Sequence, residues 1–127
     1  MDKVKRILIF DDDQSISDIM KLVMEEKGWE VLSLSQCNDA VFQIRAYQPK
    51  IIMMDNNIPD YGGVFAVKNI KQQIDLSYIP IIYFSGHYNI KILSEEAGAD
   101  AYLSKPFDLD RLDELIESLS LQNRKGI

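Results

Sequence analysis

Short apolar runs alternate with longer amphipathic segments along the whole chain. The runs have the length and composition of buried strands, and the predicted strands are 4–10, 29–34, 51–55, 80–84 and 99–103. The segment 29–34 alternates enough to indicate an edge strand. After each run, apolar residues recur at spacings of three and four, which predicts helices. The positions marking these helices are Ile16, Ile19, Met20 and Val23; Val41 and Ile44; Val64, Val67, Ile70 and Ile74; Ile92, Leu93 and Ala97; and Leu112, Leu115, Ile116 and Leu119.

Residues at the ends of these segments support the helix assignments. Gly28 suits the end of the first helix, Asn38 or Asp39 can cap the second, and that helix ends before Pro49. The last helix is expected over about 109–121, with 122–127 as a frayed tail. A strand followed by a helix, five times over, predicts an α/β fold with a parallel sheet and helices on both faces.

Length and composition agree with one soluble domain. The chain has 127 residues, of which 46% are hydrophobic and 27% charged. No apolar run approaches the length of a membrane span and no signal peptide is evident, so we expect a cytoplasmic protein with no membrane partner. The net charge of −6 argues against nucleic acid as a direct partner. The single cysteine, Cys37, excludes an internal disulfide.

Polar side chains follow four of the predicted strands. Asp11 and Asp12 follow the first, Asp55 ends the third, Ser85 follows the fourth, and Lys105 comes just after the fifth. The ends of parallel strands lie along one edge of the sheet, and such sheets bind ligands where the strand order reverses. If the order is 2-1-3-4-5, the first and third strands flank that point and bring these residues together.

This set of side chains suits phosphoryl chemistry. Three neighbouring carboxylates should have raised pKa values unless a cation neutralises them, and an oxygen-only site favours Mg²⁺. Lys105 adds a positive charge and Ser85 a hydroxyl donor for phosphoryl oxygens. Asp55 can then act as the nucleophile and form an acyl phosphate, with no further base because a carboxylate is ionised at neutral pH.

Each residue taken alone also has a structural interpretation. An acidic residue of the run 11–13, Asp13 above all, can cap the first helix, Ser85 can be a turn residue, and Lys105 a solvated charge. His87 is the only histidine, so a histidine-based triad or zinc site is not expected, and we interpret it as a loop residue near the site.

Four motifs in this order, ILIFDDD, IIMMDNNIPDYGG, IIYFSG and AYLSKPF, make the chain resemble the receiver domain of two-component response regulators over about residues 4–121. The resemblance implies a flavodoxin-like three-layer fold with strand order 2-1-3-4-5 and a single receiver domain. By position, Asp55 resembles the phosphoacceptor and Asp12 the direct Mg²⁺ ligand. Asp11 resembles its partner acting through water, and Asn57 the residue whose backbone carbonyl binds the metal.

The same resemblance assigns the remaining site residues. Ser85 matches the Ser/Thr that closes on the phosphoryl group, although threonine is commoner there. Lys105 matches the phosphate-pairing lysine, Pro106 the cis-proline, and Tyr102 the switch aromatic. Gly62 stands where many members carry Asp or Asn. No required residue is missing.

The resemblance also implies a signalling role rather than turnover of a separate substrate. The expected partners are a histidine kinase or histidine phosphotransfer protein and a downstream target or output domain. That target would dock on the surface of the fourth helix, fifth strand and fifth helix. A phosphorylation-dependent homodimer is a further assembly that the resemblance allows. Dephosphorylation would be slow and self-catalysed. With no room for an output domain after residue 121, we expect a stand-alone receiver or a piece of a larger regulator or hybrid kinase.

Two other functions compete. FDDDQS fits the start of haloacid dehalogenase-type phosphatases with Asp11 as nucleophile, but their fourth acidic motif and cap domain are missing and Asp55 would have no purpose. The other alternative is an interaction module that is never phosphorylated.

Overall fold

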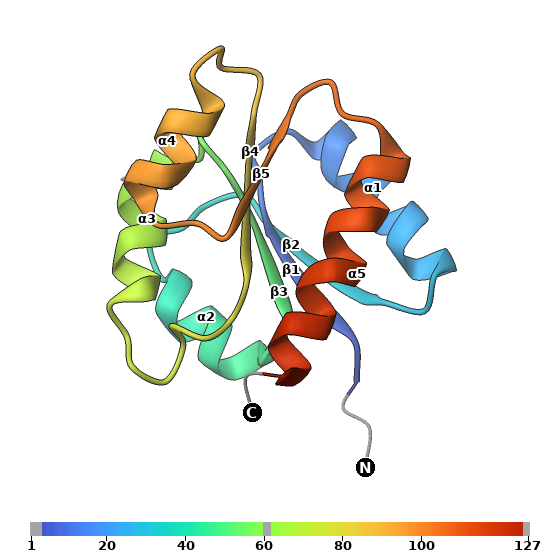
Figure 1. Ribbon diagram of the computed structural model, residues 1–127, viewed down its shortest axis with the longest axis horizontal. Coiled ribbons are helices and arrows are strands. Elements are labelled where there is room, and N and C mark those ends of the chain that lie inside the picture. Colours follow the sequence, from blue (N-terminus) through green and yellow to red (C-terminus); the bar gives the residue numbers. More distant parts are fainter. Residues whose placement is uncertain (1–3, 60–61, 126–127) are drawn as a thin grey trace.

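Within residues 4–59 and 62–125, which the computed structural model describes, the chain forms a five-stranded parallel sheet of order β2-β1-β3-β4-β5 (Figure 1). The strands are β1 Arg6–Phe10, β2 Glu30–Leu34, β3 Ile51–Asp55, β4 Ile81–Ser85 and β5 Ala101–Ser104. The helices are α1 Gln14–Glu26, α2 Ala40–Tyr47, α3 Gly62–Lys71, α4 Ile90–Ala97 and α5 Leu109–Lys125. The α/β class, the strand order and the edge position of β2 confirm the predictions.

The sheet separates two hydrophobic cores. Figure 1 shows α1 and α5 on one face and α2, α3 and α4 on the other. Because successive side chains of a strand point to opposite faces, β3 sends Ile52 and Met54 to the core under α2–α4 and Ile51 and Met53 to the core under α1 and α5. Every residue of β3 is buried, as its unbroken apolar run predicted.

The first helix begins and ends as its sequence predicted. Asp13 is its N-cap, and the Asp13 Oδ1 accepts hydrogen bonds from the backbone N–H groups of Ser15 at 3.0 Å and Ile16 at 3.4 Å. Gly28 follows the C-cap with a φ of +91°, a conformation that favours glycine. Asp39 is the N-cap residue of α2, but its side chain makes no capping hydrogen bond.

The largest error among the predicted core positions is at Ile74. We expected Ile74 to lie on the buried face of the third helix, but α3 ends at Lys71 and Ile74 is 94% exposed. The chain then turns, with hydrogen bonds from Gln73 N to Ile70 O and from Leu76 N to Gln73 O. Leu76 is buried in the core in place of Ile74.

Smaller differences concern helix faces and the last helix. Ile19 and Ile92 lie on exposed faces of α1 and α4, because α1 buries Met20 and Met24 while α4 buries Ile90 and Ala97. The last helix continues to Lys125, beyond its expected end, and residues 126–127 of the expected tail lie outside the described part of the chain. No helix among the described residues combines the length and the apolar character needed to cross a bilayer.

Candidate functional site

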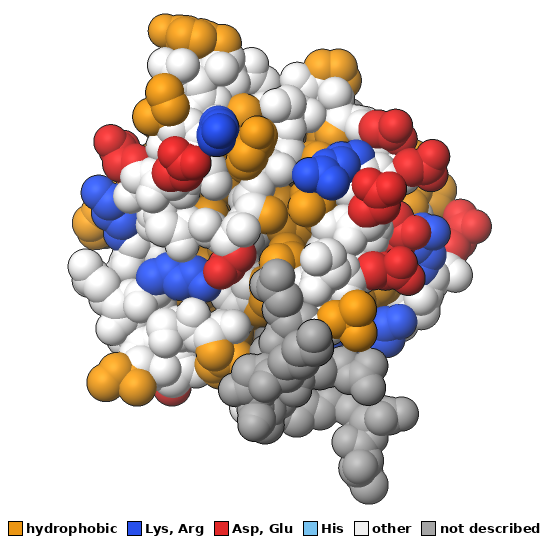
Figure 2. All heavy atoms as spheres, viewed as in Figure 1, with side chains coloured by type: hydrophobic (Ala, Val, Ile, Leu, Met, Phe, Trp, Pro, Cys, Tyr) orange, Lys and Arg blue, Asp and Glu red, His pale blue; other side chains and the backbone are white. Residues whose placement is uncertain are grey.

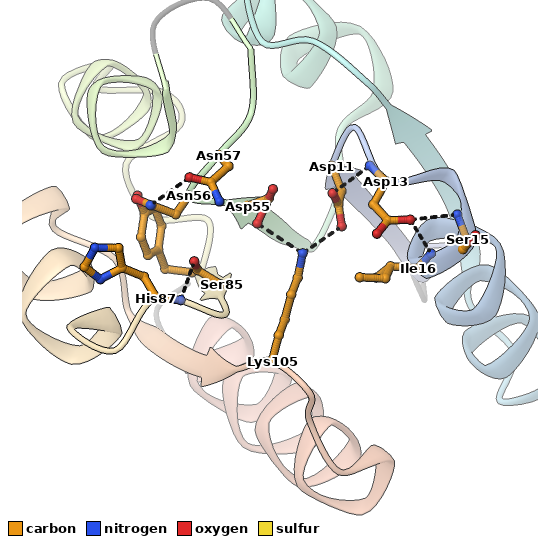
Figure 3. A network of polar contacts seen from close by, with 11 residues as sticks. Asp11, Asp13, Ser15, Ile16, Asp55, Asn56, Asn57, Ser85, His87 and Lys105 are labelled. Atoms are coloured by element: carbon orange, nitrogen blue, oxygen red, sulfur yellow. Dashed lines mark hydrogen bonds and ion pairs between the residues drawn. The ribbon is translucent and has the colours of Figure 1, made fainter.

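The polar residues predicted to meet do lie together at the carboxyl ends of the strands. β1 and β3 are neighbours in the sheet, yet α1 and α3 leave their ends toward opposite faces (Figure 1). In open sheets of this type, the crevice that binds ligands forms at such a divergence. Asp11 directly follows β1, Asp55 is the last residue of β3, and Lys105 reaches the crevice from the segment after β5 (Figure 3).

Lys105 joins two carboxylates that are distant in sequence. Its Nζ lies 3.2 Å from Asp55 Oδ1 and 3.4 Å from Asp11 Oδ2, and it lies over the Phe84 ring, 4.8 Å from the centroid (Figure 3). The Lys105 side chain is only 19% exposed, so these contacts form largely away from solvent. Partial burial makes both ion pairs stronger than pairs on an open surface.

Three carboxylates form a cluster that fits a hard cation. Asp11, Asp12 and Asp55 each offer one oxygen, and these three atoms lie within 4.8 Å of one another. Asp11 and Asp55 are buried whereas Asp12 is exposed, so the cluster opens to solvent on one side. Asp11 is further fixed by its Oδ1, which accepts a hydrogen bond from the backbone N–H of Asp13 at 2.9 Å. An all-oxygen site with solvent access suits Mg²⁺, which keeps several waters.

The environment of Asp55 disfavours its negative charge. Burial raises the pKa of the Asp55 carboxyl, the negative charge of Asp11 raises it further, and Lys105 opposes both by its charge and hydrogen bond. The net result is a pKa of Asp55 above the ordinary value. A bound divalent cation would relieve the repulsion that Lys105 only partly offsets.

Ser85 is positioned by the strand next to β3. Phe84 pairs with Asp55 in the β3–β4 register, and Ser85 follows it as a fully buried residue at the end of β4. The Ser85 Oγ accepts a hydrogen bond from the backbone N–H of His87 at 3.0 Å. That contact uses an oxygen lone pair, so the hydroxyl hydrogen can still be donated to an incoming oxygen.

The turn after β3 contains a contact that the sequence analysis missed. Tyr83 was interpreted only as part of a strand, but its hydroxyl donates a hydrogen bond to Asn56 Oδ1. Asn56 Nδ2 in turn donates to Asn57 Oδ1 at 3.3 Å. The available signal was a phenol in an otherwise apolar buried strand, because such a hydroxyl needs a partner. Asn57 itself is exposed beside the carboxylate cluster (Figure 3).

The remaining predicted residues lie around this centre. Tyr102 on β5 is 40% exposed, and with Pro106 and Phe107 it lines a shallow groove of about 260 Å³. The peptide bond between Lys105 and Pro106 is cis. His87 lies in the turn after β4, where its ring stacks on Tyr88 with centroids 4.9 Å apart, rather than joining the carboxylate cluster.

Comparison with known proteins points to one family. The model of the response regulator receiver domain matches residues 7–117. The chain is 30% identical over 103 residues to the alkaline phosphatase synthesis transcriptional regulatory protein PhoP of Bacillus subtilis, covering 81% of this chain and 43% of PhoP. It is 29% identical over 109 residues to the transcriptional regulatory protein KdpE of Staphylococcus aureus, covering 84% of this chain and 46% of KdpE. The chain thus spans about half the length of these curated relatives.

Solved structures give the same result. The CheY-like response regulator receiver domain protein of Methanospirillum hungatei has a TM-score of 0.88 at 28% identity, covering 98% of this chain and 100% of that one. The receiver domain of the Francisella response regulator 1452 has a TM-score of 0.83 at 28% identity, covering 93% and 98% of the two chains. These similarities confirm the expected flavodoxin-like fold.

Proposed function

The chain belongs to the response regulator receiver domain family, and from this premise we propose that Asp55 accepts a phosphoryl group from a phosphohistidine. Response regulators work with histidine kinases and output domains, so the donor would be a histidine kinase or a histidine phosphotransfer protein. The observation that carries the proposal is the buried Asp55 carboxylate, which Lys105 pairs with and links to the carboxylate of Asp11 at the carboxyl end of β3. This is a nucleophile next to an ammonium group that can bind a phosphoryl oxygen and to carboxylates that can hold a cation.

Asp11, Asp12 and Asp55 are the side chains that would hold Mg²⁺, together with the backbone carbonyl of Asn57. When bound, the ion would supply the positive charge that offsets the carboxylates and the phosphoryl oxygens. Burial, and then the charge of Asp11, raise the pKa of Asp55, and a bound cation would oppose both by favouring the ionised form.

In the proposed transfer, an Asp55 carboxylate oxygen attacks phosphorus and forms a P–O bond. The P–N bond of the donor phosphohistidine breaks, and its electron pair stays on the departing imidazole nitrogen. Lys105 offers its ammonium to a phosphoryl oxygen and Ser85 its hydroxyl to another. The expected fate of the product is slow hydrolysis of the acyl phosphate within this chain rather than turnover of a separate substrate.

The output surface is proposed to be the face that carries α4, β5 and α5. This face is nearest the viewer in Figure 2, where hydrophobic side chains lie between charged ones along the middle of the molecule. Ile92, Tyr102 and Leu109 are exposed there. Phosphorylation adds about −1.5 to −2 charges. Movement of Ser85 toward the phosphoryl group and inward rotation of Tyr102 would change this surface for a protein target or a second copy of the chain.

A labelling experiment tests the proposal. In one experiment the chain is incubated with Mg²⁺ and radiolabelled acetyl phosphate. In a separate experiment the phosphodonor is a histidine kinase domain that carries radiolabelled phosphohistidine. We expect label at Asp55 that is sensitive to hydroxylamine and lost in Asp55→Asn. Label that survives Asp55→Asn would contradict the proposal. Hydrolysis of a small phosphate ester that survives Asp55→Ala but is lost in Asp11→Ala would favour the phosphatase alternative, and absence of label would favour an interaction module.

A further inference from the structure

Tyr83 is a buried polar residue for which phosphotransfer alone assigns no part. It is 0% exposed, lies in β4 opposite Met54 of β3, and belongs to the core under α2–α4. Its hydroxyl donates to the side-chain oxygen of Asn56, the residue directly after Asp55. Burial, and then the charge of Asp55, raise the pKa of Tyr83, which keeps the phenol protonated and able to donate.

Asn56 connects this buried phenol to the rim of the site. Its backbone N–H donates to Phe84 O at 3.1 Å, and its backbone carbonyl accepts from Gly63 N at 3.1 Å. Its side-chain nitrogen donates to Asn57 Oδ1 at 3.3 Å. The hydrogen bonds therefore run from the Tyr83 hydroxyl through the side chain of Asn56 to the side chain of Asn57. Figure 3 shows Asn56 and Asn57 with the bond between them. The backbone carbonyl of Asn57 is the proposed metal ligand.

Gly63, at the start of α3, packs closely against Asp55 and Asn56 in the turn after β3. A Cβ on Gly63 would lie 2.6 Å from Asp55 O, 2.8 Å from Tyr83 Oη and 2.9 Å from Asn56 Cα. These distances are shorter than side-chain packing permits, so only glycine allows the helix to approach this closely. These main-chain contacts hold Asp55 and Asn56, whereas the side-chain bonds that reach Asn57 start at the Tyr83 hydroxyl.

We propose that Tyr83 is a positioning residue of the phosphoacceptor site, which orients Asn56 and through it presents Asn57 to Mg²⁺. This inference rests on the proposed function. A tyrosine that merely satisfies its own hydroxyl in the core would affect folding but not metal affinity. Tyr83→Phe distinguishes the two roles because it removes one oxygen and leaves the ring in place.

The primary test is calorimetric titration of the chain with Mg²⁺ alone, without a phosphodonor. For Tyr83→Phe we expect roughly tenfold weaker binding, the size of loss typical when a residue that orients a metal ligand is removed. Tyr78→Phe is the matched control, since Tyr78 is 60% exposed in the turn before β4, and it should bind Mg²⁺ as the wild type does. An affinity of Tyr83→Phe equal to the wild type would overturn the inference.

Asn56→Ala is a second variant. It removes the acceptor of the Tyr83 hydrogen bond, and Asn56 is less buried than Tyr83. We expect it to weaken Mg²⁺ binding as well, and Tyr83→Phe should add no further loss in the Asn56→Ala background. Independent, additive losses would contradict a shared path through Asn56. If Tyr83→Phe proves too unstable to titrate, the Asn56→Ala single variant decides the question, because wild-type Mg²⁺ affinity in that variant would overturn the inference.

Phosphorylation separates failure of this inference from failure of the proposed function. If the wild type takes no label at Asp55, or binds no Mg²⁺, both fail. If it is labelled, Tyr83→Phe should be labelled slowly at low Mg²⁺ and should recover at saturating Mg²⁺. An unchanged Mg²⁺ dependence in a labelled protein overturns only the role of Tyr83.

Discussion

At the scale of single residues, the site places two carboxylates in a buried position, where negative charge is least favoured. Asp55 is buried next to Asp11, and one ammonium group, that of Lys105, serves both carboxylates. Burial is the largest cause of the raised pKa of Asp55, followed by the charge of Asp11. A buried ionised group whose charge is not fully balanced by partners lowers the stability of the folded chain, and such a cost in stability is common at functional sites.

Asp55→Asn should therefore raise the melting temperature at neutral pH in the absence of Mg²⁺. Because the folded pKa of Asp55 lies above its unfolded value of about 4, the wild type loses stability as pH rises from that value through the folded pKa. The neutral amide has no such loss, so its advantage should be greatest near neutrality and shrink toward acidic pH. Thermal unfolding across this pH range measures the difference.

Asp75→Asn is the matched control, because the pKa of Asp75 is shifted in the opposite direction from that of Asp55. The pKa of Asp75 is lowered, chiefly by its hydrogen bond from Arg45, so the ionised form is favoured in the folded chain. This variant should gain no stability at neutral pH. An Asp55→Asn chain that is less stable than the wild type under these conditions would contradict the account of the site.

The sequence allowed some of these residue contacts to be predicted but not others. Asp11, Asp12 and Asp55 could be expected to meet because each follows a recognisable strand and parallel strands end on one edge. The phenol of Tyr83 indicated that a hydrogen-bond partner was needed, but Asn56 could not be identified as that partner, because the direction of the phenol depends on the turn after β3. The conformation of this turn depends on the close approach of Gly63 to Asp55 and Asn56.

At the scale of elements, the connection from α3 to β4 shows why the helical pattern failed at Ile74. Ile70 and Ile74 have helical spacing, so periodicity cannot mark the end of α3 at Lys71. The side chain of Lys71, the last residue of α3, bonds to the segment that follows the helix and to Asp100. Its Nζ donates to Asp100 Oδ2 at 2.8 Å, Ile79 O at 2.9 Å and Ser77 O at 3.1 Å.

Lys71→Met should destabilise the chain by about 1–3 kcal/mol, the range expected when partly buried acceptors lose their donor. Asp100 Oδ2 also accepts from the backbone N–H of Ile81 at 2.8 Å, so the loss would loosen the start of β4. Urea unfolding measures the change.

Lys68→Met on the same helix is the control, because Lys68 is exposed and a surface change of this kind typically shifts stability by no more than about 0.5 kcal/mol. Equal losses in the two variants would show that the Lys71 contacts do not stabilise this connection.

At the scale of the whole molecule, the strand order determines which of the polar residues at the strand ends come together in the site. The alternation of strands and helices predicts a parallel sheet, but it does not specify which strands are neighbours. That order came from the family resemblance, and the structure has it as β2-β1-β3-β4-β5. Only because β1 and β3 are adjacent do Asp11 and Asp12 meet Asp55, and the molecule gathers three carboxylates although it already carries a net charge of −6.

Mg²⁺ should therefore stabilise the entire fold by linkage. Binding to the folded chain alone contributes about 1.4 kcal/mol at a free concentration of about ten times the dissociation constant, and it should raise the unfolding midpoint accordingly. Removal of the ion with a chelator should reverse the shift. Asp12→Asn should lose most of this increment because it replaces one of the three clustered carboxylates with an uncharged amide. Glu95→Gln, an exposed acidic position on α4, should retain it. An equal increment in all three chains would mean that the ion acts by general screening of negative charge rather than in the crevice between β1 and β3.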